Sequence, residues 1–217
     1  MQAFIDFLAD NSNLVLGLAG QHLLLSASGT ALGLAIAFPM AVVGVLLPRL
    51  GQGFAAVANV AQTVPSFAVL GLAIPLLGIG FAPALLALTL RALLPIFLNA
   101  YVGLRELDPS LREAAKGIGM TRWQSLVQIE LPLSLPATVG GLRTAAVESI
   151  GIATLAAFIG GGGLGDLILQ GIALRDTTRL LAGAIPAAAL AIAIELSLAA
   201  LQRHLVRRTH RVARAAD

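Results

Sequence analysis

The sequence predicts an all-α integral membrane protein with about five transmembrane helices, and three observations carry that prediction. Hydrophobic residues make up 58% of the 217 residues, and the mean hydropathy is +0.90. Only 12% of the residues are charged, whereas soluble domains average about 25%. Apolar segments of about 20 residues, the length that crosses ~30 Å of hydrocarbon, recur along the chain. Because so few charges cannot cover a soluble globule, we expect a polytopic membrane protein.

Glycine, proline or charge marks each connection between the predicted spans. Residues 1–9 mix apolar and acidic side chains and predict a short interfacial helix, which ends at a polar break, Asn11–Asn13. Residues 48–53 form a tight turn, and 78–80 form an uncharged one. A hydrophilic segment follows the third span, and a glycine-rich segment follows the fourth. The predicted spans, within a single transmembrane domain over residues 1–217, are 22–47, 54–77, 81–101, 136–159 and 180–201.

The distribution of Lys and Arg predicts the orientation of the chain. With five spans, the first turn, the hydrophilic segment and the tail (202–217) share one side of the membrane and hold most of these residues, while the other side has Arg175 and Arg179. Basic loops stay in the cytoplasm, so we expect the N-terminus outside and the C-terminus inside. A sixth span at 1–20, or a re-entrant segment at 160–178, would change the span count but not the side of the hydrophilic segment. The basic residues on the predicted cytoplasmic side are Arg49, Arg105, Arg112, Lys116, Arg122, Arg203, Arg207, Arg208, Arg211 and Arg214.

The hydrophilic segment, Asp108–Pro132, predicts two short helices around a glycine turn. Asp108 before Pro109 is typical of a helix start, because the carboxylate can cap the first turn and proline lacks an N–H that would need a partner there. Apolar residues then recur at helical spacing and predict one stripe. Glycines 117 and 119 end this helix, since glycine adopts the left-handed conformation of a helix C-terminus. The stripe consists of Leu111, Ala114, Ala115 and Ile118.

A second helix is predicted to begin at a capping box formed by Thr121 and Gln124 and to end at Leu131–Pro132. We expect the small residues Ala114, Ala115 and Gly119 to face outward and to permit close approach by a partner. An ordinary cytoplasmic loop with coincidental capping residues is the alternative.

The same segment resembles the EAA signature of the permease subunits of bacterial binding-protein-dependent ABC importers. The resemblance implies a type I ABC importer permease fold in the bacterial inner membrane, with a cytoplasmic coupling loop at 104–135. It also implies that the first hairpin helix inserts into a cleft of a cytoplasmic ATPase. The matching residues, which the resemblance assigns to coupling together with Gly117, are Glu113, Ala114, Ala115, Gly119, Ile129, Leu131 and Pro132.

Further motifs within residues 63–187 are similar to the osmoprotectant branch, which imports glycine betaine, carnitine and choline. They include Thr63–Ser66, Leu76–Gly80, Leu93–Ile96, Gly117–Thr121 and Gly162–Gly165. The methionine importer permease shares the span count and the Pro-Ser element, and it is the alternative within this family. A stand-alone secondary carrier, the alternative from another class, would need internal repeats and midplane ion ligands. The sequence has no repeat, and the EAA resemblance argues against this class.

Polar residues inside the predicted spans indicate either a translocation path or internal pairing. A charge at the bilayer centre costs at least ~2.5–3.5 kcal/mol on insertion scales, so each should face the bundle or water. Pro65 should also free a carbonyl near Ala61, which needs an internal partner. Glu195 we expect to be structural. The predicted path residues are Gln62, Thr63, Pro65, Ser66, Arg91 and Glu148.

A second permease copy or a paralogue is expected, because one five-span chain does not enclose an adequate pathway. Small residues in the fourth span predict that this span contributes to the contact, since small side chains let membrane helices approach closely. The other expected partners are the ATPase dimer, a solute-binding protein outside the cell, and the lipid bilayer. The predicted contact residues are Ala137, Gly140, Gly141, Thr144 and Ala145.

Several other activities are excluded by what the sequence contains. The chain has no G-x-x-x-x-G-K-[ST] motif, so ATP and Mg²⁺ belong to a partner ATPase, and this chain is a transport subunit rather than an enzyme. Gly160–Gly165 matches G-x-G-x-x-G but lacks the βαβ context of a dinucleotide site. The three histidines are isolated, so no metal site or cofactor is expected. The basic residues lie beside membrane spans, which favours topology over nucleic-acid binding.

Overall fold

A computed structural model of the chain describes residues 2–214, with side chains described to residue 207. Within those residues all regular structure is helical. Three residues of the predicted basic tail, Arg208, Arg211 and Arg214, have side chains outside the described part. The helices are α1 (Gln2–Asp10), α2 (Ser12–Leu46), α3 (Pro48–Gln62), α4 (Ser66–Leu77), α5 (Phe81–Arg105), α6 (Pro109–Gly117), α7 (Arg122–Ser125), a π-helical turn (Leu126–Glu130), α8 (Leu131–Ala156), a 3₁₀ turn (Ala157–Ile159), α9 (Gly165–Leu174) and α10 (Thr177–Arg214).

Four helical segments among the described residues are long and apolar enough to cross a membrane, and a bent pair makes a fifth candidate. The four are α2, α5, the continuous segment Arg122–Ile159 and α10; the bent pair is α3 with α4. This count confirms the predicted all-α class with about five spans. At 35 residues, α2 is ~52 Å long at 1.5 Å per residue, which exceeds the hydrocarbon thickness. It begins at Ser12, well before the predicted start of the first span at residue 22.

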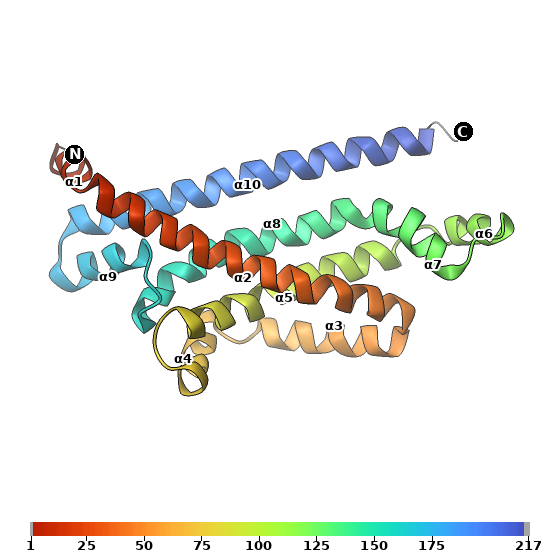
Figure 1. Cartoon of the computed structure of the whole chain (residues 1–217), viewed down its shortest axis with the longest axis horizontal. Coiled ribbons are helices and arrows are strands. Elements are labelled where there is room, and N and C mark those ends of the chain that lie inside the picture. Colours follow the sequence, from red (N-terminus) through yellow and green to blue (C-terminus); the bar gives the residue numbers. More distant parts are fainter. Residues whose placement is uncertain (1, 215–217) are drawn as a thin grey trace.

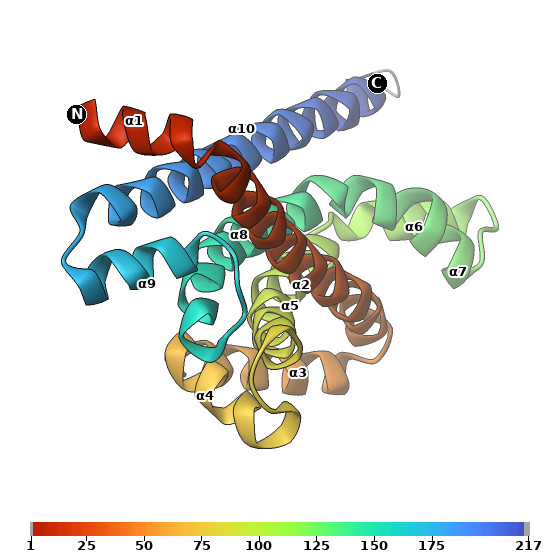
Figure 2. The ribbon, with the colours of Figure 1, turned by 60° about the vertical axis from the view of Figure 1, so that its left-hand side comes forward.

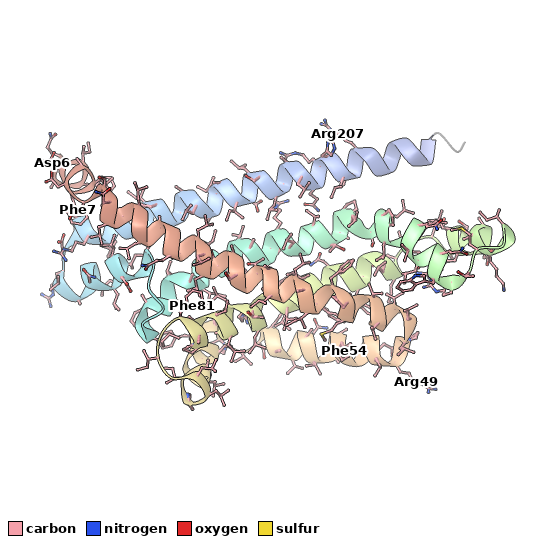
Figure 3. All side chains as sticks on the ribbon, viewed as in Figure 1. Asp6, Phe7, Arg49, Phe54, Phe81 and Arg207 are labelled. Carbon is pink, nitrogen blue, oxygen red and sulfur yellow. The ribbon has the colours of Figure 1, made fainter. Side chains whose placement is uncertain are left out.

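The molecule is elongated, and its two ends differ in charge. Figure 1 shows helices α6 and α7 and the C-terminus at one end, and the N-terminus and α9 at the other. Arg49 is the second residue of α3, because the predicted turn at 48–53 is helical, and it lies towards the α6–α7 end, whereas Asp6 lies at the opposite end (Figure 3). The fold therefore gathers the basic first turn, the hydrophilic segment and the tail at one end, as the charge pattern requires of a cytoplasmic face.

Helices α2, α5 and α8 form the centre of the bundle, and small residues bring them close together. A β-carbon added to Gly29 of α2 would lie 2.7 Å from the Leu88 Cβ of α5, and Gly33 bears the same relation to Ala92. In lipid, where apolar burial gives little net driving force, such close packing stabilises helix pairs. Figure 2 shows α10 along the outside of this centre, with α1 beside it.

The break between α3 and α4 follows from Pro65, which has no N–H to continue a helix. The backbone turns by 102° there. The Val64 N–H donates to the Ala61 carbonyl at 3.2 Å, so the turn itself supplies the internal partner that the sequence required for this group. The carbonyls of Gln62 and Val64 accept hydrogen bonds from α5 instead.

The predicted end of the second hairpin helix at Leu131–Pro132 is wrong. Helix α7 continues through the π-helical turn into α8, and the Leu131 N–H bonds to the Leu126 carbonyl five residues earlier. Pro132 lies in the first turn of α8, directly after the π-helical turn. The wider turn shifts the pattern of backbone hydrogen bonds there, so the helix continues although Pro132 has no N–H to donate. The hydrophilic segment is thus continuous with a membrane span.

Candidate functional site

The first hairpin helix, α6, has both ends fixed by the residues that the sequence identified. The Asp108 carboxylate accepts the Ser110 N–H at 2.9 Å, and this hydrogen bond holds the pKa of Asp108 below its usual value. At the other end, the Met120 N–H bonds to the Ala115 carbonyl and the Gly119 N–H to the Lys116 carbonyl, both at 3.0 Å. This pair of bonds is a Schellman motif, and Gly119 has the positive φ of 82° that it requires.

The second hairpin helix, α7, begins with the predicted capping box. The Gln124 N–H donates to Thr121 Oγ1 at 3.2 Å, and the Thr121 N–H donates to Gln124 Oε1 at 2.8 Å. Two backbone donors of the first turn are therefore satisfied by side chains, and the turn between α6 and α7 is fixed on both sides.

The tip of the hairpin exposes large apolar side chains. Ile118 is 78% exposed and Trp123 is 63% exposed, although the apolar stripe was predicted to continue to Ile118. Ile118 is the residue after α6, and the Schellman turn carries it away from the helix face. Ala114 and Gly119 are also exposed, as predicted, and so is Gly117.

Ala115 corrects one prediction, because its side chain is 2% exposed and packs inside the chain rather than facing a partner. The remaining EAA positions differ in exposure. Glu113 and Pro132 are exposed, whereas Ile129 in the π-helical turn and Leu131 at the start of α8 are half-buried.

A buried carboxylate, which sequence reasoning missed, joins the hairpin to α8. The Glu130 side chain is 1% exposed and accepts four hydrogen bonds. Arg112 Nε donates to it at 3.0 Å, Arg122 donates through both terminal nitrogens, and Ser125 Oγ donates at 3.1 Å. Arg112 also donates to the Leu104 carbonyl at 2.9 Å. Glu130 therefore connects α6, α7 and the end of α5 at one point.

A polar cavity of about 310 Å³ lies between α5, α8 and the end of α3. Pro95 and Leu98 supply its apolar part. Three of the predicted path residues, Gln62, Arg91 and Glu148, meet in this cavity, although they come from three different helices. Its polar lining consists of Gln62, Arg91, Asn99, Thr144 and Glu148.

Arg91 also stabilises the break between α3 and α4. Its Nη1 donates to the Val64 carbonyl at 3.1 Å and to the Gln62 carbonyl at 3.4 Å. Its Nε is buried and has no hydrogen-bond partner. A guanidinium offers five donors, so Arg91 retains hydrogen-bonding capacity beyond these backbone contacts.

The other predicted path residues do not line the cavity. Thr63 donates to the Val60 carbonyl at 2.7 Å, and Pro65 and Ser66 form the break and the start of α4. The structure instead adds Asn99, which lies one helical turn after Pro95, and Thr144, which the sequence assigned to a contact between permeases. Spacing of four residues from Arg91 to Pro95 to Asn99 was the available signal for this face of α5.

The second pair of intramembrane charges is satisfied within the chain. Arg143 of α8 donates to Glu195 of α10, and it also donates to Gln202 Oε1 at 3.2 Å. Gln202 in turn donates to the Pro136 carbonyl at 3.1 Å. These bonds fasten α10 to α8, so the structural role expected for Glu195 fits its contacts.

The predicted permease contact on the fourth span needs correction. A β-carbon on Gly141 would lie 2.7 Å from the Pro95 carbonyl oxygen of α5, and Ala145 is fully buried against the same helix. Ala137 lies against Gly103 of α5. This small-residue series packs α8 on α5 within one chain, so it is not a surface for a second copy. Gly140 faces Gln202 of α10, and Thr144 is exposed.

Comparisons with known proteins identify the family. The family model described as "Binding-protein-dependent transport system inner membrane component" matches residues 29–211. The chain belongs to this family. It is the membrane permease subunit of an ABC importer in the inner membrane, and a separate ATPase hydrolyses the ATP. The predicted resemblance is confirmed.

Curated relatives align with nearly the whole chain. The carnitine transport permease OpuCB of Listeria monocytogenes is 41% identical over 99% of this chain and 98% of its own length. The glycine betaine/carnitine/choline permease OpuCB of Bacillus subtilis is 42% identical over 94% of both. The osmoprotectant import permease OsmW of Salmonella typhimurium is 43% identical over 91% of this chain and 94% of that protein.

Solved structures show the same fold at lower identity. An inward-facing MetNI methionine ABC transporter matches with a TM-score of 0.81 at 21% identity, over 88% of this chain and 96% of that chain. An amino acid ABC transporter with histidines matches with a TM-score of 0.73 at 18% identity, over 93% and 96%. These matches confirm the predicted type I importer permease fold.

Proposed function

We propose that the chain carries quaternary-ammonium osmolytes such as glycine betaine, carnitine or choline across the inner membrane. The observation that supports this substrate class is the alignment at about 40% identity, over almost the whole chain, with permeases that carry these substrate names. The likeness to the methionine transporter concerns the fold alone, because its identity is 21%.

The exposed tip of the hairpin is the proposed docking surface for a cytoplasmic ATPase dimer. Ile118 and Trp123 place apolar area there, and Ala114 and Gly119 leave room for close approach. Glu113, exposed and without a partner among the described residues, is available to the ATPase. ATP and Mg²⁺ bind in the ATPase, and the Glu130 contacts transmit its movement to α5 and α8.

The polar cavity lies on the proposed translocation path. Asn99, Thr144 and Glu148 are exposed on helices that cross the membrane, and polar groups at that depth must face protein or water rather than lipid. A second permease copy or paralogue covers this face and completes the path. A solute-binding protein delivers the solute at the end opposite the hairpin.

Uptake of radiolabelled solutes by cells that express the complete transporter tests the substrate class. We expect uptake of glycine betaine, carnitine or choline, and no uptake in matched cells that lack this chain. Methionine uptake without uptake of any quaternary ammonium would overturn the proposal and favour the methionine-type alternative.

A further inference from the structure

The charges in the polar cavity differ from the Arg143–Glu195 pair because neither forms an ion pair with any described residue. Glu148 makes no hydrogen bond or ion pair with any described residue, and its side chain is exposed. Among the described residues, Arg91 donates hydrogen bonds only to the backbone carbonyls of Gln62 and Val64. No ion pair joins Arg91 to Glu148, although both line the same cavity. The chain thus leaves one cation and one anion facing a shared space.

Pairing within the chain does not explain this arrangement. An unpaired charge in a membrane span carries a large insertion penalty, and the Arg143–Glu195 contact shows that this chain can form an ion pair across two spans. A pair between Arg91 and Glu148 would reduce the penalty in the same way. Separate Arg91 and Glu148 side chains can each bind one charged group of a ligand that carries charges of both signs.

The chemistry of the lining points to a zwitterion. A guanidinium binds a carboxylate through N–H donors, and the Arg91 Nη2 makes no hydrogen bond to any described residue, so it remains available, whereas the unpartnered Nε is buried. Glu148 supplies the opposite charge for a cationic group. The volume of about 310 Å³ is at the low end for ligand sites, which suits a small solute.

The lining also indicates weak binding. Tight sites for quaternary ammonium groups use aromatic cages, and none of the residues that line this cavity is aromatic. A transport pathway needs binding that is strong enough to admit a solute and weak enough to release it. An electrostatic site without a cage meets both requirements.

We propose that this cavity is a transit site for small zwitterions, in which Arg91 binds the carboxylate and Glu148 binds the cationic group. This inference rests on the proposed function and narrows it. Glycine betaine and carnitine offer both charges to the site, whereas choline offers only the cation. The transmembrane subunit therefore adds its own preference to that of the solute-binding protein.

Saturation-transfer NMR on the purified permease–ATPase complex in nanodiscs, without the binding protein, tests the proposal with glycine betaine and choline as probes. We expect the unaltered complex to give a betaine signal. In Arg91→Gln, the apparent affinity for betaine should fall about tenfold, a change of about 1.4 kcal/mol, whereas the affinity for choline should stay within about twofold of the unaltered value. Glu148→Gln should weaken both ligands, and Glu148→Asp should retain them.

Arg143→Gln and Glu195→Gln are matched controls, because they make the same chemical changes in the Arg143–Glu195 ion pair. Both should leave the ratio of betaine affinity to choline affinity unchanged. If Arg91→Gln fails to assemble, the affinities of Glu148→Gln and Glu148→Asp for the two ligands are compared instead, and equal affinities in these two variants would overturn the proposal. No betaine signal in the unaltered complex, or equal losses in the controls, would overturn the proposal. Failure of the proposed function is distinguishable, because it would appear as absent osmolyte uptake in cells.

Discussion

Two carboxylates on one continuous helical segment, Glu130 and Glu148, have opposite surroundings. Glu130 is buried and accepts four hydrogen bonds from two arginines and a serine. Glu148 is exposed and has no partner among the described residues, although it lies in a helix that crosses the membrane. The first belongs to the hydrophilic end of the molecule, and the second belongs to the polar cavity.

The different surroundings of Glu130 and Glu148 indicate two different roles. A carboxylate whose hydrogen-bonding capacity is filled by its own chain fixes the relative positions of α5, α6, α7 and α8. A carboxylate that the chain leaves without partners is available to a solute, water or a second subunit. We therefore infer that Glu130 serves coupling to the ATPase and that Glu148 serves the solute.

Replacing Glu130 should give the largest structural effect. Glu130→Ala removes the common partner of Arg112 and Arg122, and the loss of a hydrogen bond to a charged group typically costs about 1.5–3 kcal/mol. We expect amides in residues 109–125 to lose protection in hydrogen exchange and the yield of the ATPase complex to fall. Glu148→Ala is the control and should leave hairpin protection unchanged. Equal loss of hairpin protection in both variants would erase the distinction between the two carboxylates.

Gly119→Val should disrupt docking next most strongly. A β-branched residue at a φ of 82° is strained by roughly 1–2 kcal/mol, and its side chain would project from the exposed tip. We expect the ATPase to be lost during co-purification. Gly17→Ala, a helical position with open space around it, serves as the control and should retain the ATPase. Full ATPase recovery with Gly119→Val would place the docking surface elsewhere.

Trp123→Ala should weaken ATPase binding without unfolding the hairpin. The side chain is 63% exposed, so its removal creates no cavity, but an exposed tryptophan at a contact commonly contributes strongly to affinity. We expect roughly tenfold weaker binding of the ATPase, which is about 1.4 kcal/mol, by titration against the permease in nanodiscs. Hydrogen exchange in α7 should stay unchanged, and unaltered affinity would count against the proposed surface.

Asp108→Ala should give the smallest effect, a local one. The Ser110 N–H loses its acceptor, so the first turn of α6 should exchange a few-fold faster. Asp108→Asn, which keeps an acceptor, should behave like the unaltered chain. The lowered pKa of Asp108 means that the charged cap is present at neutral pH and is lost only as the pH falls through that lowered pKa. Faster exchange across the whole hairpin would show that the cap does more than fix one turn.

Sequence reasoning succeeded where the signals were local. The Asp108 cap, the Thr121–Gln124 capping box and the left-handed Gly119 depend on neighbours within a few residues, and each forms as predicted. The break at Pro65 also has a local cause, but the sequence predicts one span over 54–77, and the structure divides it into α3 and α4.

Contacts between distant residues were beyond such reasoning. Glu130 lies 18 residues from Arg112 along the chain, and no local sequence signal predicts the π-helical turn that carries α7 past Pro132. The small-residue series on α8 correctly indicated a close helix contact, but nothing in the spacing showed that the partner was α5 of the same chain. Glu148 and Arg91 were recognised as unusual, yet only the fold shows that they share a cavity without pairing.

The most direct test measures ATP hydrolysis and glycine betaine uptake together in proteoliposomes that contain the permease, its ATPase and the binding protein. We expect Glu130→Gln to lower both rates in proportion, because the hairpin no longer holds the ATPase in a fixed position relative to α5 and α8. Glu148→Gln should retain hydrolysis stimulated by the binding protein while uptake falls, so more ATP is hydrolysed for each solute transported. The same ratio of hydrolysis to uptake in both variants would contradict the division of labour between the two carboxylates.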